Sequence, residues 1–199
     1  MGRVAIFIDG GYLDFVLREE FDNARIDYEK FAAWMAGPNE LLRTYYYHCL
    51  PFQSSPPTDE ERRRFSHAQS FFGRLGRIPR FHVREGKLAY RGRDASTGLP
   101  FFEQKRVDLM LGLDMALLAT KRQISDVVLF SGDSDLLPAV EAVKSEGVLF
   151  RLYHGTAQRP HADLYAAADE RVALSADVIQ SILRRYSIGS PKYGNVLVK

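Results

Sequence analysis

Short apolar runs alternate with amphipathic stretches along most of the chain. Residues 4–8 and 127–130 are uninterrupted apolar runs, the pattern of strands buried on both faces of a parallel sheet. Residues 106–121 and 136–145 carry apolar side chains at helical spacing. This alternation predicts an α/β fold, with an open, mostly parallel sheet and helices on both faces.

The remaining elements complete one domain. We expect further strands over residues 43–50, 78–84, 148–153 and 171–174, and further helices over residues 12–20, 27–35, 58–75 and 176–185. Thr58, followed by three acidic residues, is typical of a helix N-cap.

Glu85-Gly86-Lys87 is expected to turn the strand over residues 78–84 into a hairpin that returns through Arg91. A chain of 199 residues suits a single domain over residues 1–185, with a basic hairpin or loop excursion around residues 84–104 and a flexible tail over residues 186–199.

Carboxylates follow two of the buried strands at the point where each strand ends. Asp9 comes directly after residues 4–8, and Asp133 and Asp135 come shortly after residues 127–130. Asp108 lies in the first turn of the helix expected over residues 106–121. In open α/β sheets, ligands bind beyond the carboxyl ends of the strands. If that helix is the crossover into residues 127–130, the four side chains converge at this edge.

Clustered carboxylates repel each other, and a hard divalent cation removes the penalty. All-oxygen sites suit Mg²⁺ or Mn²⁺, and such ions activate water and stabilise the charge that develops in phosphodiester hydrolysis. Each aspartate also has a simpler interpretation. Asp9 and the Asp133–Asp135 pair could be helix caps, and Asp108 could favour a helix dipole. The convergence of three separate segments favours the metal site.

Two features near this cluster stay open. Asp114 lies six residues after Asp108, roughly 240° further around a regular helix, so the two cannot share a face. Its apolar neighbours allow either a buried hydrogen-bonding role or a role behind the metal ligands. His154 and His161 flank a loop that could border the site, but two histidines alone are a weak signal, and no His/Cys spacing suggests zinc.

The charge distribution is uneven although the net charge is only +2. Residues 60–106 hold twelve Lys/Arg and five Asp/Glu, a local charge of +7 that hints at a surface facing a polyanion. Lys87, Arg91 and Arg93 are interleaved with Tyr90, and a basic loop with an aromatic ring can grip a single strand. The arginines of residues 62–64 point in three directions on a helix, which favours a solvated surface.

The chain lacks the marks of a secreted or membrane-inserted protein. Its single cysteine, Cys49, lies in an apolar run and indicates a core residue in a reducing cytoplasm. No stretch approaches the ~20 apolar residues needed to cross a membrane. We therefore expect a cytoplasmic protein with no membrane partner.

Three segments together resemble the NYN domain, and more narrowly its LabA/DUF88 branch, within the PIN-like nuclease superfamily. They read FIDGGYL near the start, QKRVDLMLGLDMALLA in the middle and VVLFSGDSDLLPAVEAVKSEG afterwards. The resemblance covers residues 3–174 in order, and SGDSD in front of an amphipathic helix is its most specific part.

The resemblance implies a Rossmann-like fold, an acidic site for Mg²⁺ or Mn²⁺, and RNA as substrate. The family's acidic positions match Asp9, Asp108, Asp133 and Asp135, while its small hydroxyl and basic positions match Ser131 and Lys105. Two departures stand out: Tyr12 replaces a frequent Asn, and Arg106 replaces the Gly of the usual KGVD, which adds a cation for phosphate and alters the turn. PIN-like domains are often dimers, so a homodimer is expected by analogy.

Two functions follow from this reading. The first is a metal-dependent endoribonuclease that cuts single-stranded RNA, in which Asp9, Asp133 and Asp135 hold the metal and Asp108 completes the shell or orients the water. Lys105 and Ser131 would contact the scissile phosphate, and Arg106 would add a further contact. The alternative is a catalytically weak RNA-binding or protein-interaction module that keeps the fold, which the intact carboxylates argue against.

Overall fold

A sheet with strand order β4-β3-β2-β1-β5-β6-β7 forms the centre of the computed structural model, which describes residues 2–93 and 100–184. Neighbouring strands run parallel except for β4, which is antiparallel to β3. The strands are β1 (Arg3–Asp9), β2 (Glu40–Cys49), β3 (Phe81–Arg93), β4 (Pro100–Lys105), β5 (Asp126–Phe130), β6 (Leu149–Gly155) and β7 (Glu170–Leu174). The helices are α1 (Gly10–Glu20), α2 (Tyr28–Ala36), α3 (Asp59–Leu75), α4 (Val107–Thr120), η1 (Ser134–Leu136, a 3-10 turn), α5 (Leu137–Ser145), α6 (Ala162–Ala167) and α7 (Ala176–Ile182).

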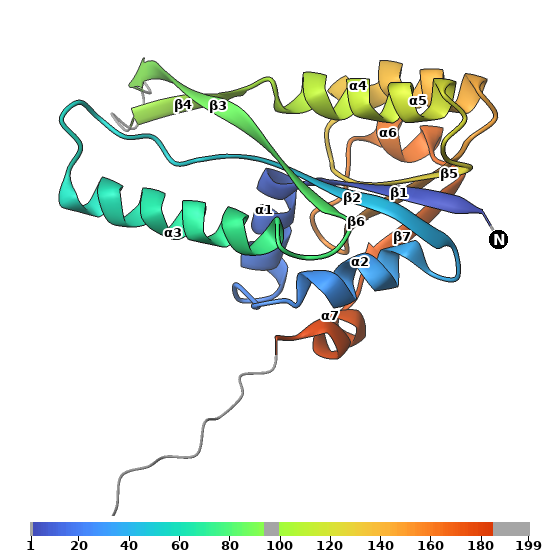
Figure 1. The fold of residues 1–199 in the computed structure, drawn as a ribbon, viewed down its shortest axis with the longest axis horizontal. Coiled ribbons are helices and arrows are strands. Elements are labelled where there is room, and N and C mark those ends of the chain that lie inside the picture. The colour runs from blue at the N-terminus through green and yellow to red at the C-terminus, as the bar shows by residue number, and fades with distance from the viewer. Residues whose placement is uncertain (1, 94–99, 185–199) are drawn as a thin grey trace, which may run out of the picture.

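Helices cover both faces of the sheet. Figure 1 shows α4, α5 and α6 on one side and α1, α2, α3 and α7 on the other. The alternation of side chains along a strand sends Ile6 and Ile8 into one core, and Ala5 and Phe7 into the second core beneath α4 and α5. Residues 4–8 are apolar throughout because both faces of β1 are covered. The predicted α/β architecture with a mostly parallel sheet is confirmed.

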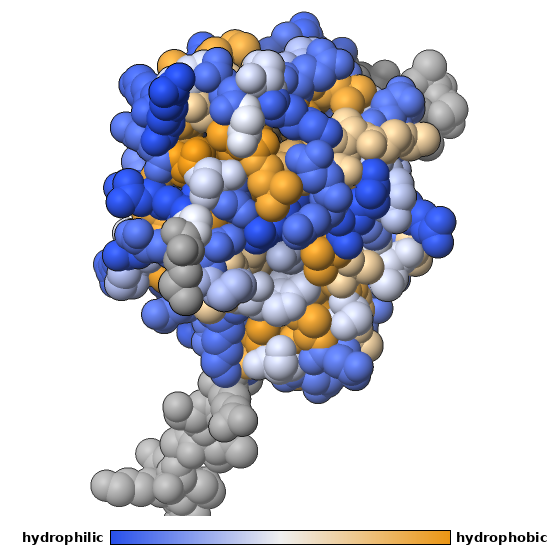
Figure 2. Space-filling view, turned by 90° about the vertical axis from the view of Figure 1, so that its right-hand side faces the viewer, coloured by the Kyte–Doolittle hydropathy of each residue, from blue (hydrophilic) through white to orange (hydrophobic). Residues whose placement is uncertain are grey.

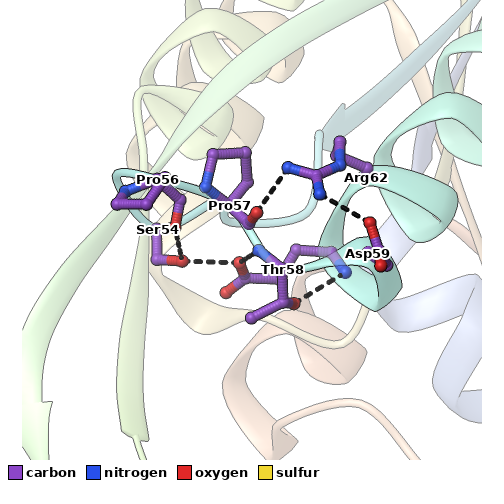
Figure 3. A network of polar contacts seen from close by, with 7 residues as sticks. Ser54, Pro56, Pro57, Thr58, Asp59 and Arg62 are labelled. Carbon is purple, nitrogen blue, oxygen red and sulfur yellow. Dashed lines mark hydrogen bonds and ion pairs between the residues drawn. The ribbon is translucent and has the colours of Figure 1, made fainter.

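The start of α3 is built from a reciprocal pair of hydrogen bonds (Figure 3). The Thr58 hydroxyl accepts from the Glu61 backbone N–H at 3.2 Å, and the Glu61 carboxylate accepts from the Thr58 N–H at 2.8 Å. That carboxylate also accepts from the Ser54 hydroxyl at 2.6 Å. Thr58 is therefore the N-cap that its sequence context predicted, and the cap ties the proline-rich loop before α3 to the helix.

The predicted turn at residues 85–87 is wrong, because β3 runs straight through it. The strand pairs with β2 up to Gly86 and with β4 from Lys87 onward, so it changes partner at this point. Gly86 is there for close packing rather than for a turn: a Cβ would lie 2.6 Å from Val107 Cγ2 and 2.9 Å from Cys49 Sγ. The second strand of the hairpin is β4. Residues 94–99 and the predicted tail over residues 186–199 lie outside the described residues.

A partly buried charge network joins α4 to the sheet. The Asp114 carboxylate accepts from the Arg84 guanidinium at 2.9 and 2.6 Å and from the Tyr47 hydroxyl at 2.8 Å. Only 14% of the Asp114 side chain is exposed. Of the two roles considered for Asp114, the structure therefore shows the buried hydrogen-bonding one. Its contacts link α4 to β2 and β3.

The outer side of α4 is apolar. Leu109, Leu113 and Leu117 are 66%, 52% and 48% exposed, whereas Leu111 and Met115 on the inner side are fully buried. In Figure 2, apolar side chains are seen mainly in the upper half, on the side of the molecule that carries α4 and α5. Among the helices of residues 2–93 and 100–184, none is both long and apolar enough to span a membrane.

We expect Asp114→Ala to lower the free energy of unfolding by about 2–3 kcal/mol, because it leaves the Arg84 guanidinium and the Tyr47 hydroxyl without their partner. Urea denaturation measures the change. Glu141→Ala, at an exposed position on α5, is the matched control and should shift stability by less than about 0.5 kcal/mol. Equal effects of the two substitutions would show that the network adds nothing to stability.

Candidate active site at the carboxyl edge of the sheet

Asp9 lies where β1 ends and α1 begins. Its carboxylate caps α1 by accepting from the Tyr12 N–H at 3.1 Å, and it accepts from the Ser131 hydroxyl at 3.2 Å. Ser131 follows β5, which pairs with β1 in parallel, so the register of these two strands places both residues at one edge. Asp9 is therefore both a helix cap and a member of the cluster.

Ser131 also organises the turn after β5. Its hydroxyl oxygen accepts from the Asp133 N–H at 3.3 Å, and the Asp133 carboxylate in turn accepts from the Asp135 N–H at 2.9 Å and caps η1. Ser131 is fully buried. The predicted contact between Ser131 and phosphate is corrected by this geometry, because the hydroxyl is enclosed and serves the two aspartates. Asp135 is exposed at the rim.

Asp108 comes to the same edge from the first turn of α4. Burial raises the pKa of this half-buried carboxyl, and the negative charges of Asp133, Asp9 and Asp135 raise it further, in that order of size. Burial also raises the pKa of Asp9, against hydrogen bonds from Tyr12 and Ser131 and the charge of His48 that lower it. The structure thus brings the other three predicted carboxylates within electrostatic reach of Asp108.

The donor set is all oxygen and carries excess negative charge, which suits a hard divalent cation. Burial raises the pKa of Asp9, and burial together with neighbouring carboxylates raises that of Asp108. A bound cation would offset both effects. However, in the described part of the chain no three His, Cys, Asp or Glu side chains already stand at the separations of a metal-ligand set. The residues fit a cation by chemistry and charge, and their side chains would have to draw together around it.

A loop after β6 is attached beside this edge by two residues of α1, Glu20 and Tyr12. Glu20 accepts from the Thr156 N–H at 2.8 Å and from the Gln158 N–H at 2.7 Å, and these hydrogen bonds lower its pKa despite burial. The Tyr12 hydroxyl donates to the Gln158 carbonyl and accepts from the Gly155 N–H at 3.3 Å. In the sequence, Tyr12 stood out only as a departure from the family's frequent Asn, and nothing marked Glu20.

Tyr12 also braces the turn after β5. A Cβ on Gly132 would lie 2.7 Å from the Tyr12 ring, so this glycine is needed for the close approach. The His161 N–H donates to the Gly132 carbonyl at 3.0 Å, which brings the loop over residues 155–161 to the border of the site. His154 is buried and packs on Tyr165, consistent with a structural residue.

His48 and Asp14 form a pair on the other side of Asp9. His48 Nδ1 accepts from the Cys49 N–H at 2.7 Å, so in the neutral ring Nε2 carries the proton and donates to Asp14 at 3.0 Å. Gly10 makes room for this ring, because a Cβ there would lie 2.7 Å from His48 Cδ2. When this ring is protonated, its positive charge lowers the pKa of Asp9, against the larger effect of burial.

The basic residues gather where the hairpin meets α4. Lys105 and Arg106 directly precede α4 and its Asp108, and Lys87 faces Lys105 across the β3–β4 ladder. Like charges placed opposite each other on a ladder repel, and an anion would relieve this. Arg91 follows Tyr90 at a shift in the register, and the side chain of Arg93 lies outside the described residues.

The aromatic ring expected among these cations is engaged elsewhere. Tyr90 packs on Phe52 and Phe102, with ring centroids 6.0 and 5.7 Å away, while remaining 49% exposed. Successive side chains of a strand point to opposite faces, so Lys87 and Tyr90 project to opposite sides of the hairpin. The cations and the ring therefore do not form one surface.

Arg106 holds an unfavourable backbone conformation. Its φ of 76° is left-handed, the region in which glycine is favoured, and no side-chain hydrogen bond caps α4. The backbone at Arg106 thus keeps the left-handed conformation that the family's usual glycine would adopt. Arg122, at the other end of α4, also has a positive φ, of 52°.

Comparison with known proteins connects this geometry to a family. The NYN domain family profile matches residues 3–175. Among solved structures, the fold is similar to a Vibrio parahaemolyticus protein of unknown function, with a TM-score of 0.57 and 21% identity over 92% of this chain and 96% of that one. The comparison with curated proteins found no match to the chain.

We expect Arg106→Gly to raise the free energy of unfolding by roughly 0.5–1 kcal/mol, because glycine adopts the left-handed conformation without a steric penalty. Arg122→Gly should give a similar gain, and it serves as the control at the far end of the helix. Urea titrations of both variants measure the effect. A loss of stability in Arg106→Gly alone would mean that the arginine side chain makes contacts that outweigh the strain.

Asp108→Asn should stabilise the protein at neutral pH by about 1 kcal/mol, the scale of a partly screened charge interaction. The pKa of Asp108 is raised in the folded state, so the ionised group costs stability above that pKa, and the cost disappears as pH falls through it. The gain should therefore shrink on acidification. Thermal unfolding of wild type and variant between pH 4 and pH 8 measures it, and a gain that grows toward acid would contradict the assignment.

Proposed function

The chain belongs to the NYN domain family of the PIN-like nuclease superfamily, and from this we propose that it is a metal-dependent endonuclease acting on single-stranded RNA. The observation that carries the proposal is the approach of Asp9 and Asp133 to Asp108 at the carboxyl edge of the sheet, where burial and the charges of these neighbours raise the pKa of Asp108. A cluster of carboxylates repels a phosphodiester unless a cation is present.

Asp9, Asp133 and Asp135 are the residues that would hold Mg²⁺ or Mn²⁺, with Asp108 completing the set. The ion would supply a water made nucleophilic at neutral pH and would offset the charge that develops on the phosphate. Ser131 keeps Asp9 and the Asp133 backbone in place through its two hydrogen bonds. This places the carboxylates before substrate arrives, so less reorganisation is needed.

Lys105, Arg106 and Lys87 are the groups placed to bind the phosphates next to the cut. Lys105 and Arg106 are exposed and precede α4, while Lys87 faces Lys105 across the ladder. Arg91 and Arg93, further along the hairpin, would extend this contact to neighbouring nucleotides. The strained backbone at Arg106 supports a role for its guanidinium, because a glycine would relieve the strain.

One observation favours the second candidate, a catalytically weak RNA-binding or protein-interaction module. Within residues 2–93 and 100–184, no ready-made set of three metal-ligating side chains is present. Calorimetric titration with Mn²⁺ separates the two functions. Binding that is lost in Asp9→Asn supports the nuclease, whereas no binding at millimolar Mn²⁺ supports the module.

The nuclease itself is tested with a panel of single-stranded and duplex RNA and DNA, with Mn²⁺, Mg²⁺ or EDTA. We expect cleavage of single-stranded RNA with metal and none with EDTA. Asp133→Asn and Asp9→Asn should each lower kcat about a hundredfold or more, since each removes charge from the metal site. Asp177→Asn, on α7 of the opposite face, is the control and should cleave like wild type. Full activity in Asp133→Asn would refute the assignment.

A further inference from the structure

A cleft of about 850 Å³ lies between α1 and α3, on the face of the sheet opposite α4. Its floor is apolar and includes Leu17, Tyr28, Phe71 and Leu75. Tyr28 and Phe71 pack together with ring centroids 5.4 Å apart. The metal and phosphate residues described above are not among its lining residues, so it is a separate feature of the surface.

Four arginines and three carboxylates line this cleft, which leaves a small excess of positive charge. Arg18 on α1, Arg74 on α3, Arg25 after α1 and Arg184 after α7 are all exposed and line it, with His67. Of its acidic lining residues, Asp27 accepts from the Glu29 and Lys30 N–H groups, Asp14 is bonded to His48, and Glu29 is exposed. Arg18 is paired with Glu19 at 2.8 Å at the surface. Apolar rings below and guanidinium groups above match a ligand with flat rings and regularly spaced negative charges.

The cleft and the carboxylate edge share helix α1, which Asp9 caps. The cleft begins at Asp14, whose partner His48 lies against Gly10, the residue after Asp9. From there it follows α1 toward Arg18, which lies nine residues, or roughly 14 Å, along the helix from Asp9. Figure 1 shows α1 and α3 on the same side of the sheet, with α1 starting at the end of β1. A chain held at Asp9 can therefore pass His48 and enter the cleft.

We propose that the α1–α3 cleft binds the nucleotides that flank the cut in a single-stranded RNA, with bases over the apolar floor and phosphates at Arg18 and Arg74. This deepens the proposed nuclease function and rests on it, because that function supplies the strand. Base–aromatic contacts tolerate any sequence, and guanidinium groups bind phosphate in a bidentate way. The cleft thus selects for length of single strand rather than for sequence.

Binding is measured by fluorescence anisotropy with Mn²⁺ and labelled RNA analogues that resist hydrolysis, of about twelve nucleotides and of about three. The variant Arg18→Glu/Arg74→Glu should weaken binding of the longer RNA about tenfold or more and leave the short one unchanged. The slope of log K against log salt should fall by about 1.4, since each single-strand phosphate contact contributes about 0.7. Lys121→Glu/Arg122→Glu, at the end of α4 on the other face, makes the same change in charge and is the control.

Equal effects of the two double variants would overturn the cleft assignment, because only net charge would then matter. Cleavage kinetics distinguish failure of the cleft assignment from failure of the nuclease proposal. The cleft variant should raise KM for the longer RNA with kcat unchanged, while Asp133→Asn lowers kcat. If wild type binds the longer RNA through Arg18 and Arg74 but does not cleave it, the cleft assignment is supported and the nuclease proposal is refuted. If wild type cleaves RNA and the cleft variant has the same KM, the cleft assignment is refuted and the nuclease proposal is kept.

Discussion

The parallel pairing of β1 with β5 is the constraint on which the site depends. It aligns Ile8 with Phe130, so the residues that follow, Asp9 and Ser131, come within hydrogen-bond distance. Parallel strands require crossovers, and α4 is the helix that leads into β5, so its first turn starts at the same edge with Asp108. Three segments distant in sequence are therefore placed together by one feature of the sheet.

Holding carboxylates together costs free energy, and the surrounding structure provides the restraint. Asp9 and Asp133 each accept a hydrogen bond from a helix N-terminus, which holds their side chains in place. The Arg84–Asp114–Tyr47 network attaches α4 to β2 and β3, which keeps Asp108 from moving away from its repelling neighbours. On the opposite side, Glu20 and Tyr12 tie down the loop after β6. These contacts outside the cluster thus hold the carboxylates together despite their mutual repulsion.

The surfaces around this edge differ in chemistry. The hairpin side presents Lys87 and Lys105 opposite each other beside Arg106. The side of α1 and α3 presents an apolar cleft with an arginine rim. The outer side of α4 is leucine-rich, with Leu109 two-thirds exposed. A long polyanion that reaches the carboxylates would find cations on two sides of them and an apolar surface on the third.

Much of this could be predicted from residues alone, since periodicity and caps are local properties. The apolar run over residues 4–8, the Thr58 cap and the strand-end carboxylates Asp9 and Asp133 were each readable in a short window. The turn at residues 85–87 was misread because Gly86 permits close packing against Val107 and Cys49, contacts that no window of sequence contains.

Other features were decided only by the fold. Asp114 became a structural partner because β3 placed Arg84 beside it, and Ser131 was enclosed because β1 and β5 meet there. His48, Glu20 and the α1–α3 cleft had no signal in the sequence, because each depends on segments packed from distant parts of the chain. Local chemistry determined which residues could form a site, and long-range packing determined which of them face it.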